Sequence, residues 1–136
     1  MSYPDAATYD TLPKLLRLHA GEHGAEVAMR EKDFGIWRSL SWADVLARTR
    51  AIALGLAGLG IGAEGVVALI GDNRPDWVMG ELAAHALRAR SLGIYRDALD
   101  EEVAAPFTHA DAHVVLGPDE QQVDTLMEIL RPIPPL

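Results

Sequence analysis

Residues 42 to 59 repeat their apolar positions every three to four residues, which is the spacing of one helix face. The positions on this face are Trp42, Val45, Leu46, Thr49, Ile52, Ala53, Leu56 and Leu59. Ser41 and Asp44 precede the pattern with the spacing of a capping box, in which a hydroxyl and a carboxylate each satisfy a backbone N–H. The pattern therefore predicts a helix from residue 42 to the glycines after residue 59.

A continuous apolar run, VVALI, follows at residues 66–70. Because it is short, rich in β-branched residues and does not alternate, it is typical of a strand buried on both faces. Later segments continue the alternation of helix and strand: a helix at 75–87, a strand at 92–95, a helix at 99–109, a strand at 113–116 and a helix at 120–130. This order predicts right-handed βαβ units on a parallel sheet. Pro106 lies inside the helix predicted at 99–109, which we expect to be irregular for that reason.

The first forty residues have a different pattern. Leucines at helical spacing after Pro13 predict a short helix over 11–24, ending at Gly21 or Gly24. Two short segments, 27–31 and 36–40, predict a small hairpin with its turn at 32–35. We therefore expect one α/β domain over residues 1–136, with a parallel sheet and flanking helices from about residue 42, preceded by an N-terminal helix and a small β-hairpin.

Three glycines in LGIGAEGVVALI have the spacing G-x-G-x-x-G: Gly60, Gly62 and Gly65. A dinucleotide-binding loop with this spacing must follow a strand and open a helix, because the pyrophosphate rests on the N–H groups of the first helical turn. Here the glycines follow a predicted helix and precede a predicted strand. We interpret them as a helix stop and a reversal of the chain.

The net charge is −8, and the acidic excess lies after residue 96, where Arg131 is the only Lys or Arg. Such a segment repels phosphate backbones, so we expect no nucleic-acid partner. The chain has no cysteine, its first residues are unlike a signal peptide, and no apolar run approaches the roughly 20 residues of a membrane span. These features predict a soluble, cytoplasmic protein without a transmembrane segment.

Histidine spacing offers two possible metal pairs. His19 and His23 are four residues apart but enclose Gly21, where the helix is expected to break, and His109 and His113 straddle a predicted helix end. We therefore expect surface histidines and no metal ligands, with His85 on a partly covered helix face.

Parallel sheets bind ligands beyond the carboxyl ends of their strands. In this chain those ends are the loops at 71–74, 96–98 and 117–119, where the candidate residues are Asp72, Asn73, Arg74 and Asp97. Arg74 could hold an anion and Asp72 a hydroxyl, but the acidic and amide side chains are equally suited to turns and helix caps, with Asp72 or Asn73 as the cap of the helix near Pro75. A small α/β nucleotide or phospho-acceptor domain that uses Asp72 or Asp97, and that requires magnesium, is a further alternative.

Three stretches, IWRSLSWADV at 36–45, ALIGDNRPDWV at 68–78 and GIYRD at 93–97, resemble the start of AMP-forming acyl-CoA synthetases, particularly the long-chain fatty-acid type. The resemblance covers nearly the whole chain but only the opening portion of the family, whose members are several times longer. Arg88 and Arg90 depart from it, because the family usually has small or apolar residues there.

The resemblance implies a parent reaction in which Mg-ATP converts a carboxylic acid to an acyl-adenylate, from which the thiol of coenzyme A displaces AMP. The family's phosphate loop with lysine, its Tyr-Gly-x-Thr-Glu segment, its ribose-binding aspartate and its C-terminal catalytic lysine have no counterpart here, where the lysines are Lys14 and Lys32. We therefore expect no catalytic, cofactor-binding or metal residue in this chain. The expected partners are the remaining subdomains of a parent ligase, or a second copy bound through uncovered apolar surface. The alternative is a stand-alone, non-catalytic interaction module.

Overall fold

The computed structural model describes residues 4–94, 107, 109–117 and 124. In chain order its elements are α1 (Leu12–Glu22), β1 (Val27–Asp33), β2 (Ile36–Ser41), α2 (Trp42–Gly58), β3 (Val66–Ile70), α3 (Pro75–Ala86), β4 (Arg90–Ile94) and β5 (Val114–Leu116). The predicted α/β class, with an N-terminal helix and hairpin before a parallel sheet, is confirmed. The helix predicted at 120–130 and most of the one at 99–109, including Pro106, lie outside the described residues.

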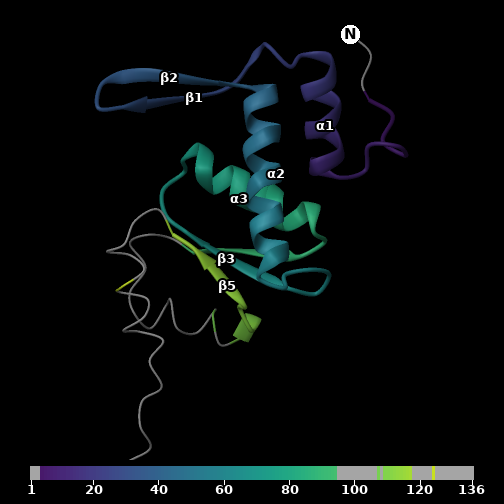
Figure 1. Ribbon diagram of the computed structural model, residues 1–136, viewed down its shortest axis with the longest axis vertical. Helices are drawn as coiled ribbons and strands as arrows, with labels where there is room; N and C mark the ends of the chain where they lie inside the picture. The colour runs from purple at the N-terminus through teal and green to yellow at the C-terminus, as the bar shows by residue number, and fades with distance from the viewer. Residues whose placement is uncertain (1–3, 95–106, 108, 118–123, 125–136) are drawn as a thin grey trace, which may run out of the picture.

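The sheet places β3 at its centre, in the order β4-β3-β5, and both neighbours run parallel to it. All five residues of β3 are buried, as the apolar run predicted. Val67 and Leu69 pack with residues of α2 and α3, while Ala68 and Ile70 pack with Ile94 and Phe107 in a separate cluster, as expected for alternating side chains. Figure 1 shows α2 and α3 stacked against the sheet.

The capping box at the start of α2 is confirmed. The backbone N–H of Asp44 donates to Ser41 Oγ at 3.1 Å, and the backbone N–H of Ser41 donates to Asp44 Oδ2 at 2.9 Å. The hydrogen bond from the Ser41 hydroxyl, followed by the one from its backbone N–H, lowers the pKa of Asp44. Val45, Thr49, Ala53 and Leu56 form the buried face of the helix, on the predicted period.

The glycine-rich segment reverses the chain between α2 and β3, as interpreted from the sequence. Gly60 has φ +88, a conformation that glycine adopts without strain. Gly65 has little room, since an added Cβ would lie 3.0 Å from the carbonyl oxygen of Gly62. The other left-handed position in this segment is occupied by Glu64, with φ +71.

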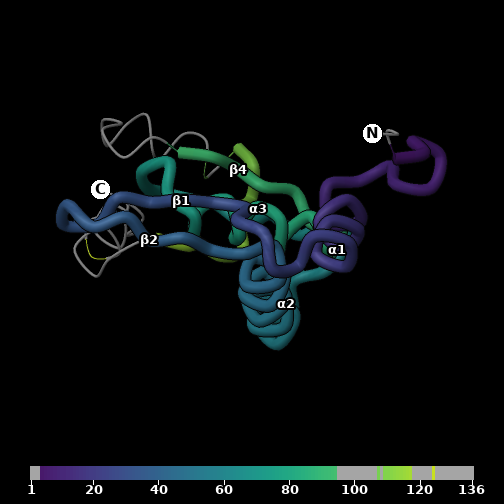
Figure 2. Tube along the Cα trace, turned by 90° about the horizontal axis from the view of Figure 1, so that it is seen from above, coloured from purple at the N-terminus to yellow at the C-terminus, as the bar shows by residue number. Residues whose placement is uncertain are grey.

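The hairpin turn is shorter than predicted. Asp33 pairs with Ile36, so only Phe34 and Gly35 form the turn, with φ +46 and +83. Positive φ at both turn residues is typical of a type I′ turn, whose backbone twist matches that of the two flanking strands. Figures 1 and 2 show the hairpin reaching away from α1, with its turn farthest from that helix.

Arg88 and Arg90, the two residues that depart from the family resemblance, lie where the chain passes from α3 into β4. Arg88 has φ +63 just after α3, the position that glycine usually fills at a helix end. The backbone N–H of Arg90 donates to the carbonyl of Gly65 at 2.8 Å, which begins β4 two residues before the predicted start. Its guanidinium reaches the carbonyl of Glu64 at 3.3 Å.

Helix α1 ends at Glu22, after Gly21 and before Gly24, and buries Leu16 against Val45 and Met79. Across the described ranges, none of the helices combines the length and apolar character needed to cross a bilayer.

Candidate functional site

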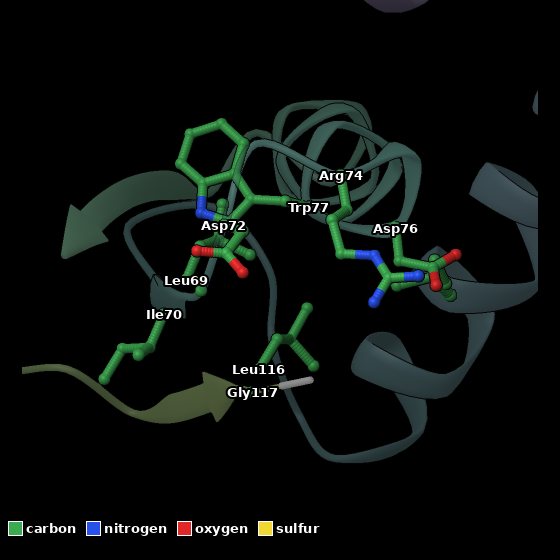
Figure 3. Close-up of a pocket in the computed structure, with 10 residues that line it drawn as sticks. Leu69, Ile70, Asp72, Arg74, Asp76, Trp77, Leu116 and Gly117 are labelled. Carbon is green, nitrogen blue, oxygen red and sulfur yellow. The ribbon is translucent and has the colours of Figure 1, made fainter. Parts of the chain in front are cut away.

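The carboxyl ends of β3 and β5 border a pocket of about 400 Å³. Its apolar walls come from α2, β3, α3 and β5 through Ile52, Leu69, Trp77 and Leu116. Its polar groups come from the loop after β3 and the start of α3, through Asp72, Arg74 and Asp76 (Figure 3). The pocket therefore lies where ligands bind in parallel sheets, and its charged groups are mostly acidic.

The loop after β3 is shaped by its first and last residues. Gly71 has φ +140, which a residue with a side chain rarely adopts, and Pro75 occupies the first turn of α3. Because a proline at that position favours an extended residue before it, Arg74 becomes the N-cap residue, with φ −103 and ψ 160. The prediction that Asp72 or Asn73 caps α3 is wrong, and Arg74 makes no side-chain cap bond.

The guanidinium of Arg74 bonds to the hairpin. Its Nε donates to Glu31 Oε1 at 2.6 Å, and its Nη2 lies 4.0 Å from Asp33 Oδ1. The hydrogen bond to Glu31 is the main reason that the pKa of Arg74 is raised. An anion in the strand-end pocket would have to compete with these two carboxylates for the same side chain.

The structure brings together two of the four candidate residues. Asp72 and Arg74 line the strand-end pocket, whereas Asn73 lines a neighbouring, shallower pocket of about 420 Å³ between the hairpin and the loop. Arg74 borders both pockets, and Asp97 lies outside the described residues.

Sequence reasoning missed Trp77 and Glu31 as parts of this region. A Cβ at Gly93 would lie 3.1 Å from Trp77 Cζ2, so the glycine of GIYRD allows the ring to sit over β4. A glycine inside a predicted strand is a signal for such close approach. No local sequence pattern pairs Glu31 with Arg74, because the two residues are 43 positions apart.

The histidines do not form a metal centre in the described part of the chain, where no group of three metal-ligating side chains occurs. His19 is half-buried and stacks on Trp42 with ring centroids 4.8 Å apart, which makes it less exposed than expected. His23 Nδ1 lies 2.9 Å from Glu26 Oε1. His85 is half-buried, as predicted, with Nε2 3.0 Å from the hydroxyl of Ser91.

Comparison with known proteins gives the family of this fold. The family model described as "AMP-binding enzyme" matches residues 16–134. The chain belongs to the AMP-binding enzyme family. Within this family it is similar to the N-terminal portion of acyl-CoA synthetases, as the sequence resemblance implied.

Two relatives show how much of a family member the chain represents. It is 31% identical over 87 residues to the uncharacterized protein Rv1549 of Mycobacterium tuberculosis, covering 64% of this chain and 49% of that protein. It is 26% identical over 102 residues to the long-chain-fatty-acid–CoA ligase FadD15 of Mycobacterium bovis, covering 75% of this chain and 17% of the ligase. The chain thus spans about half of one relative and less than a fifth of the other.

A solved structure confirms the fold. The inhibitor-bound N-terminal domain of FACL13 from Mycobacterium tuberculosis superposes with a TM-score of 0.74 at 22% identity, covering 84% of this chain and 29% of that one.

Proposed function

We propose that this chain, as a single α/β domain, is the N-terminal scaffold of a long-chain acyl-CoA synthetase and has no catalytic or ATP-binding residue of its own. The parent enzyme would join a fatty acid to coenzyme A with conversion of ATP to AMP and pyrophosphate. ATP, magnesium and coenzyme A would then bind to the remaining subdomains, which are the expected partners of this one.

The family match over residues 16–134 supports the parent enzyme, and the composition of the strand-end pocket is the observation that carries the non-catalytic part of this proposal. A polyphosphate requires several cationic or N–H donors, but this pocket has Asp72 and Asp76 beside one guanidinium that already donates to Glu31. Neither lysine lines it, since Lys14 on α1 pairs with Asp10, which precedes that helix, and Lys32 Nζ lies 6.0 Å from the centroid of the Trp37 ring on the hairpin. The described residues that line this pocket do not fit ATP, so we derive no adenylation step from them.

The first test is ATP–pyrophosphate exchange by the purified chain with magnesium and a long-chain fatty acid. We expect no exchange above a heat-denatured control, and exchange above it would overturn the non-catalytic assignment. The scaffold role is tested by replacing the matched segment of FadD15 with this chain. A folded chimaera that forms acyl-CoA supports the proposal, whereas a chimaera that melts cooperatively but is inactive contradicts it. The variant Leu69→Asp in the chimaera should abolish both folding and activity.

A stand-alone interaction module is a second candidate, supported by the hairpin and by Rv1549. Phe34, Ile36 and Trp37 are 98%, 67% and 64% exposed, an unusual set of large apolar side chains for one short hairpin. The aligned 87 residues make up 49% of Rv1549, whereas the 102 residues aligned to FadD15 make up only 17% of that ligase. Rv1549 is therefore much shorter than FadD15.

Sedimentation across micromolar concentrations separates the two candidates. An isolated scaffold should self-associate through surface that its missing subdomains cover. The double variant Phe34→Ser/Trp37→Ser should then weaken association without lowering the melting temperature. A chain that stays monomeric argues for the independent module.

A further inference from the structure

The strand-end pocket contains more negative than positive side chains. Two carboxylates, those of Asp72 and Asp76, and one guanidinium, that of Arg74, lie among its described lining residues. The guanidinium donates to Glu31 at 2.6 Å and lies 4.0 Å from Asp33, and neither of these hairpin residues lines the pocket. Figure 3 shows the Arg74 side chain turned toward Asp76 and away from Asp72. The cation of the described lining is therefore engaged largely by carboxylates outside the pocket.

The start of α3 does not give the pocket a preference for anions. A helix N-terminus carries a partial positive charge, but Asp76 lies in the first turn of α3 and its carboxylate opposes that charge. An anion in the pocket would meet the carboxylates of Asp72 and Asp76, and would compete with Glu31 for Arg74. An anion at Arg74, which the sequence alone allows, is therefore the poorer fit.

The walls of the pocket suit the apolar part of a small organic ligand. Ile52, Leu69 and Leu116 line it together with the indole of Trp77, and its volume of about 400 Å³ is within the range of small-molecule sites. The indole lies over β4, where an added Cβ at Gly93 would be 3.1 Å from its Cζ2. Aromatic rings attract cations placed over their faces, and tryptophan does so most strongly. The pocket therefore offers a small organic cation both an aromatic ring and apolar walls.

A metal ion fits this lining less well than an organic cation. Metal ions require several oxygen or nitrogen ligands, and no group of three metal-ligating side chains occurs among the described residues. An organic ammonium ion requires fewer charged partners, because its carbon atoms also gain from contact with apolar walls. Each carboxylate accepts several hydrogen bonds, so Asp72 can accept one from an ammonium group in addition to its interaction within the chain.

We propose that the strand-end pocket binds a primary organic ammonium ion, whose N–H groups donate to Asp72 and Asp76 and whose apolar part packs against Trp77. Glu31 sets this charge preference from outside the pocket, because it holds the guanidinium of Arg74 on the hairpin side. This binding does not depend on the proposed scaffold function, which the exchange and chimaera experiments test separately.

Calorimetric titration of the whole chain with phenethylammonium tests the assignment, with 2-phenylethanol and 3-phenylpropionate as the matched neutral and anionic ligands. We expect one phenethylammonium per chain, and binding at least about tenfold weaker for the alcohol and for the carboxylate. Equal affinity for the ammonium and the alcohol would overturn the role of the two aspartates. Absence of saturable phenethylammonium binding at millimolar concentrations would overturn the site itself.

The tryptophan side chains locate the bound ligand. In a proton–nitrogen correlation spectrum, phenethylammonium should shift the indole N–H resonance of Trp77, whereas Trp37 and Trp42 lie outside the pocket lining and should not respond. Asp72→Asn should weaken binding about tenfold, and Asp111→Asn, a matched change outside the lining, should leave it unchanged. Shifts confined to Trp37 or Trp42, or equal affinity for the two variants, would contradict the proposed site.

Glu31→Gln tests the control that the hairpin exerts on the pocket. Release of the guanidinium should weaken phenethylammonium binding and strengthen 3-phenylpropionate binding, each by up to about fivefold, the size expected for a partly exposed ion pair. Glu64→Gln removes the same charge at a residue that neither lines the pocket nor pairs with Arg74, and should change neither affinity. If the ratio of the two affinities is the same in Glu31→Gln as in the wild-type chain, Glu31 does not set the preference and its assigned role is wrong.

Discussion

Strand β3 and the hairpin strand β2 are both short and rich in apolar residues, but they differ completely in burial. All five residues of β3 are buried, while the first four residues of β2, from Ile36 to Ser39, are exposed. The difference comes from neighbours, since β3 lies between two strands with side chains packed on both faces, and β2 pairs only with β1. Apolar sequence therefore produced a core in one place and an uncovered surface in the other.

The largest expected effect tests the buried side of this contrast. Leu69 is 1% exposed, so Leu69→Ala should lower the free energy of unfolding by about 2–5 kcal/mol through lost burial and a cavity. Leu54 on α2 is 64% exposed, and Leu54→Ala should change the free energy of unfolding by less than about 0.5 kcal/mol. Urea unfolding monitored by circular dichroism measures both. Comparable losses for the two variants would show that the contrast in burial does not control stability.

The next effect tests how firmly the base of the hairpin is fixed to α1. An added Cβ at Gly24 would lie 2.7 Å from the carbonyl oxygen of Ala20, so Gly24→Ala should destabilise the fold by about 1–3 kcal/mol. Gly21 has open space around its Cβ position, so Gly21→Ala should instead stabilise α1 by up to about 1 kcal/mol. Thermal melts of the two variants should shift in opposite directions, and a shift in the same direction contradicts the packing described for Gly24.

A smaller effect is expected where β2 passes into α2. Ser41→Ala removes the helix cap and should cost about 1 kcal/mol, whereas Ser39→Ala on the exposed part of the hairpin should cost less than about 0.5 kcal/mol. The cap also depends on pH, because its hydrogen bonds lower the pKa of Asp44 below the ordinary value of 3.8.

That carboxylate therefore stabilises the fold above pH 3.8, and its contribution is lost as the pH falls through the lowered pKa of the folded state. The stability difference between the wild-type chain and Ser41→Ala should narrow in acid. A pH series of urea unfolding curves measures it, and a difference that widens in acid would contradict the assigned hydrogen bonds.

The smallest effect concerns the contact between the hairpin and the strand-end loop. A double-mutant cycle with Arg74→Gln and Glu31→Gln should give a weakly favourable coupling that disappears at high salt, because both side chains are partly exposed. Arg30, on the same hairpin but without an ion pair in the described residues, provides the matched control through Arg30→Gln with Glu31→Gln. Equal coupling in the two cycles would mean that the Arg74 contact does not anchor the hairpin.

The elements predicted well from sequence are those defined by neighbouring residues. Helix α2 combines a 3.6-residue period with a capping box, and β3 is a continuous run, so both follow from local chemistry. The hairpin turn is shorter than the predicted four residues because Phe34 adopts a positive φ, which is uncommon for an aromatic residue.

The candidate site was predictable only in part. Asp72 and Arg74 line a pocket at the carboxyl end of β3, where strand order alone places them, and their role in binding a ligand stays a prediction. The cap of α3 was misassigned because Pro75 determines its position more strongly than the preferences of Asp72 or Asn73. The partner of Arg74 could not be predicted, because Glu31 approaches it through the packing of the hairpin rather than through any sequence spacing.

The two faces of β3 also differ in when they can be covered during synthesis on the ribosome. The face toward α2 and α3 packs mainly against residues of these two helices, which flank β3 in the chain, whereas the opposite face packs against Ile94 and the more distant Phe107. Phe107 follows Ile70 by 37 positions, which take about 2–7 s to translate at about 5–20 residues per second. For that interval Ala68 and Ile70 lack the cover of Phe107, so the nascent chain exposes apolar surface that the finished fold buries.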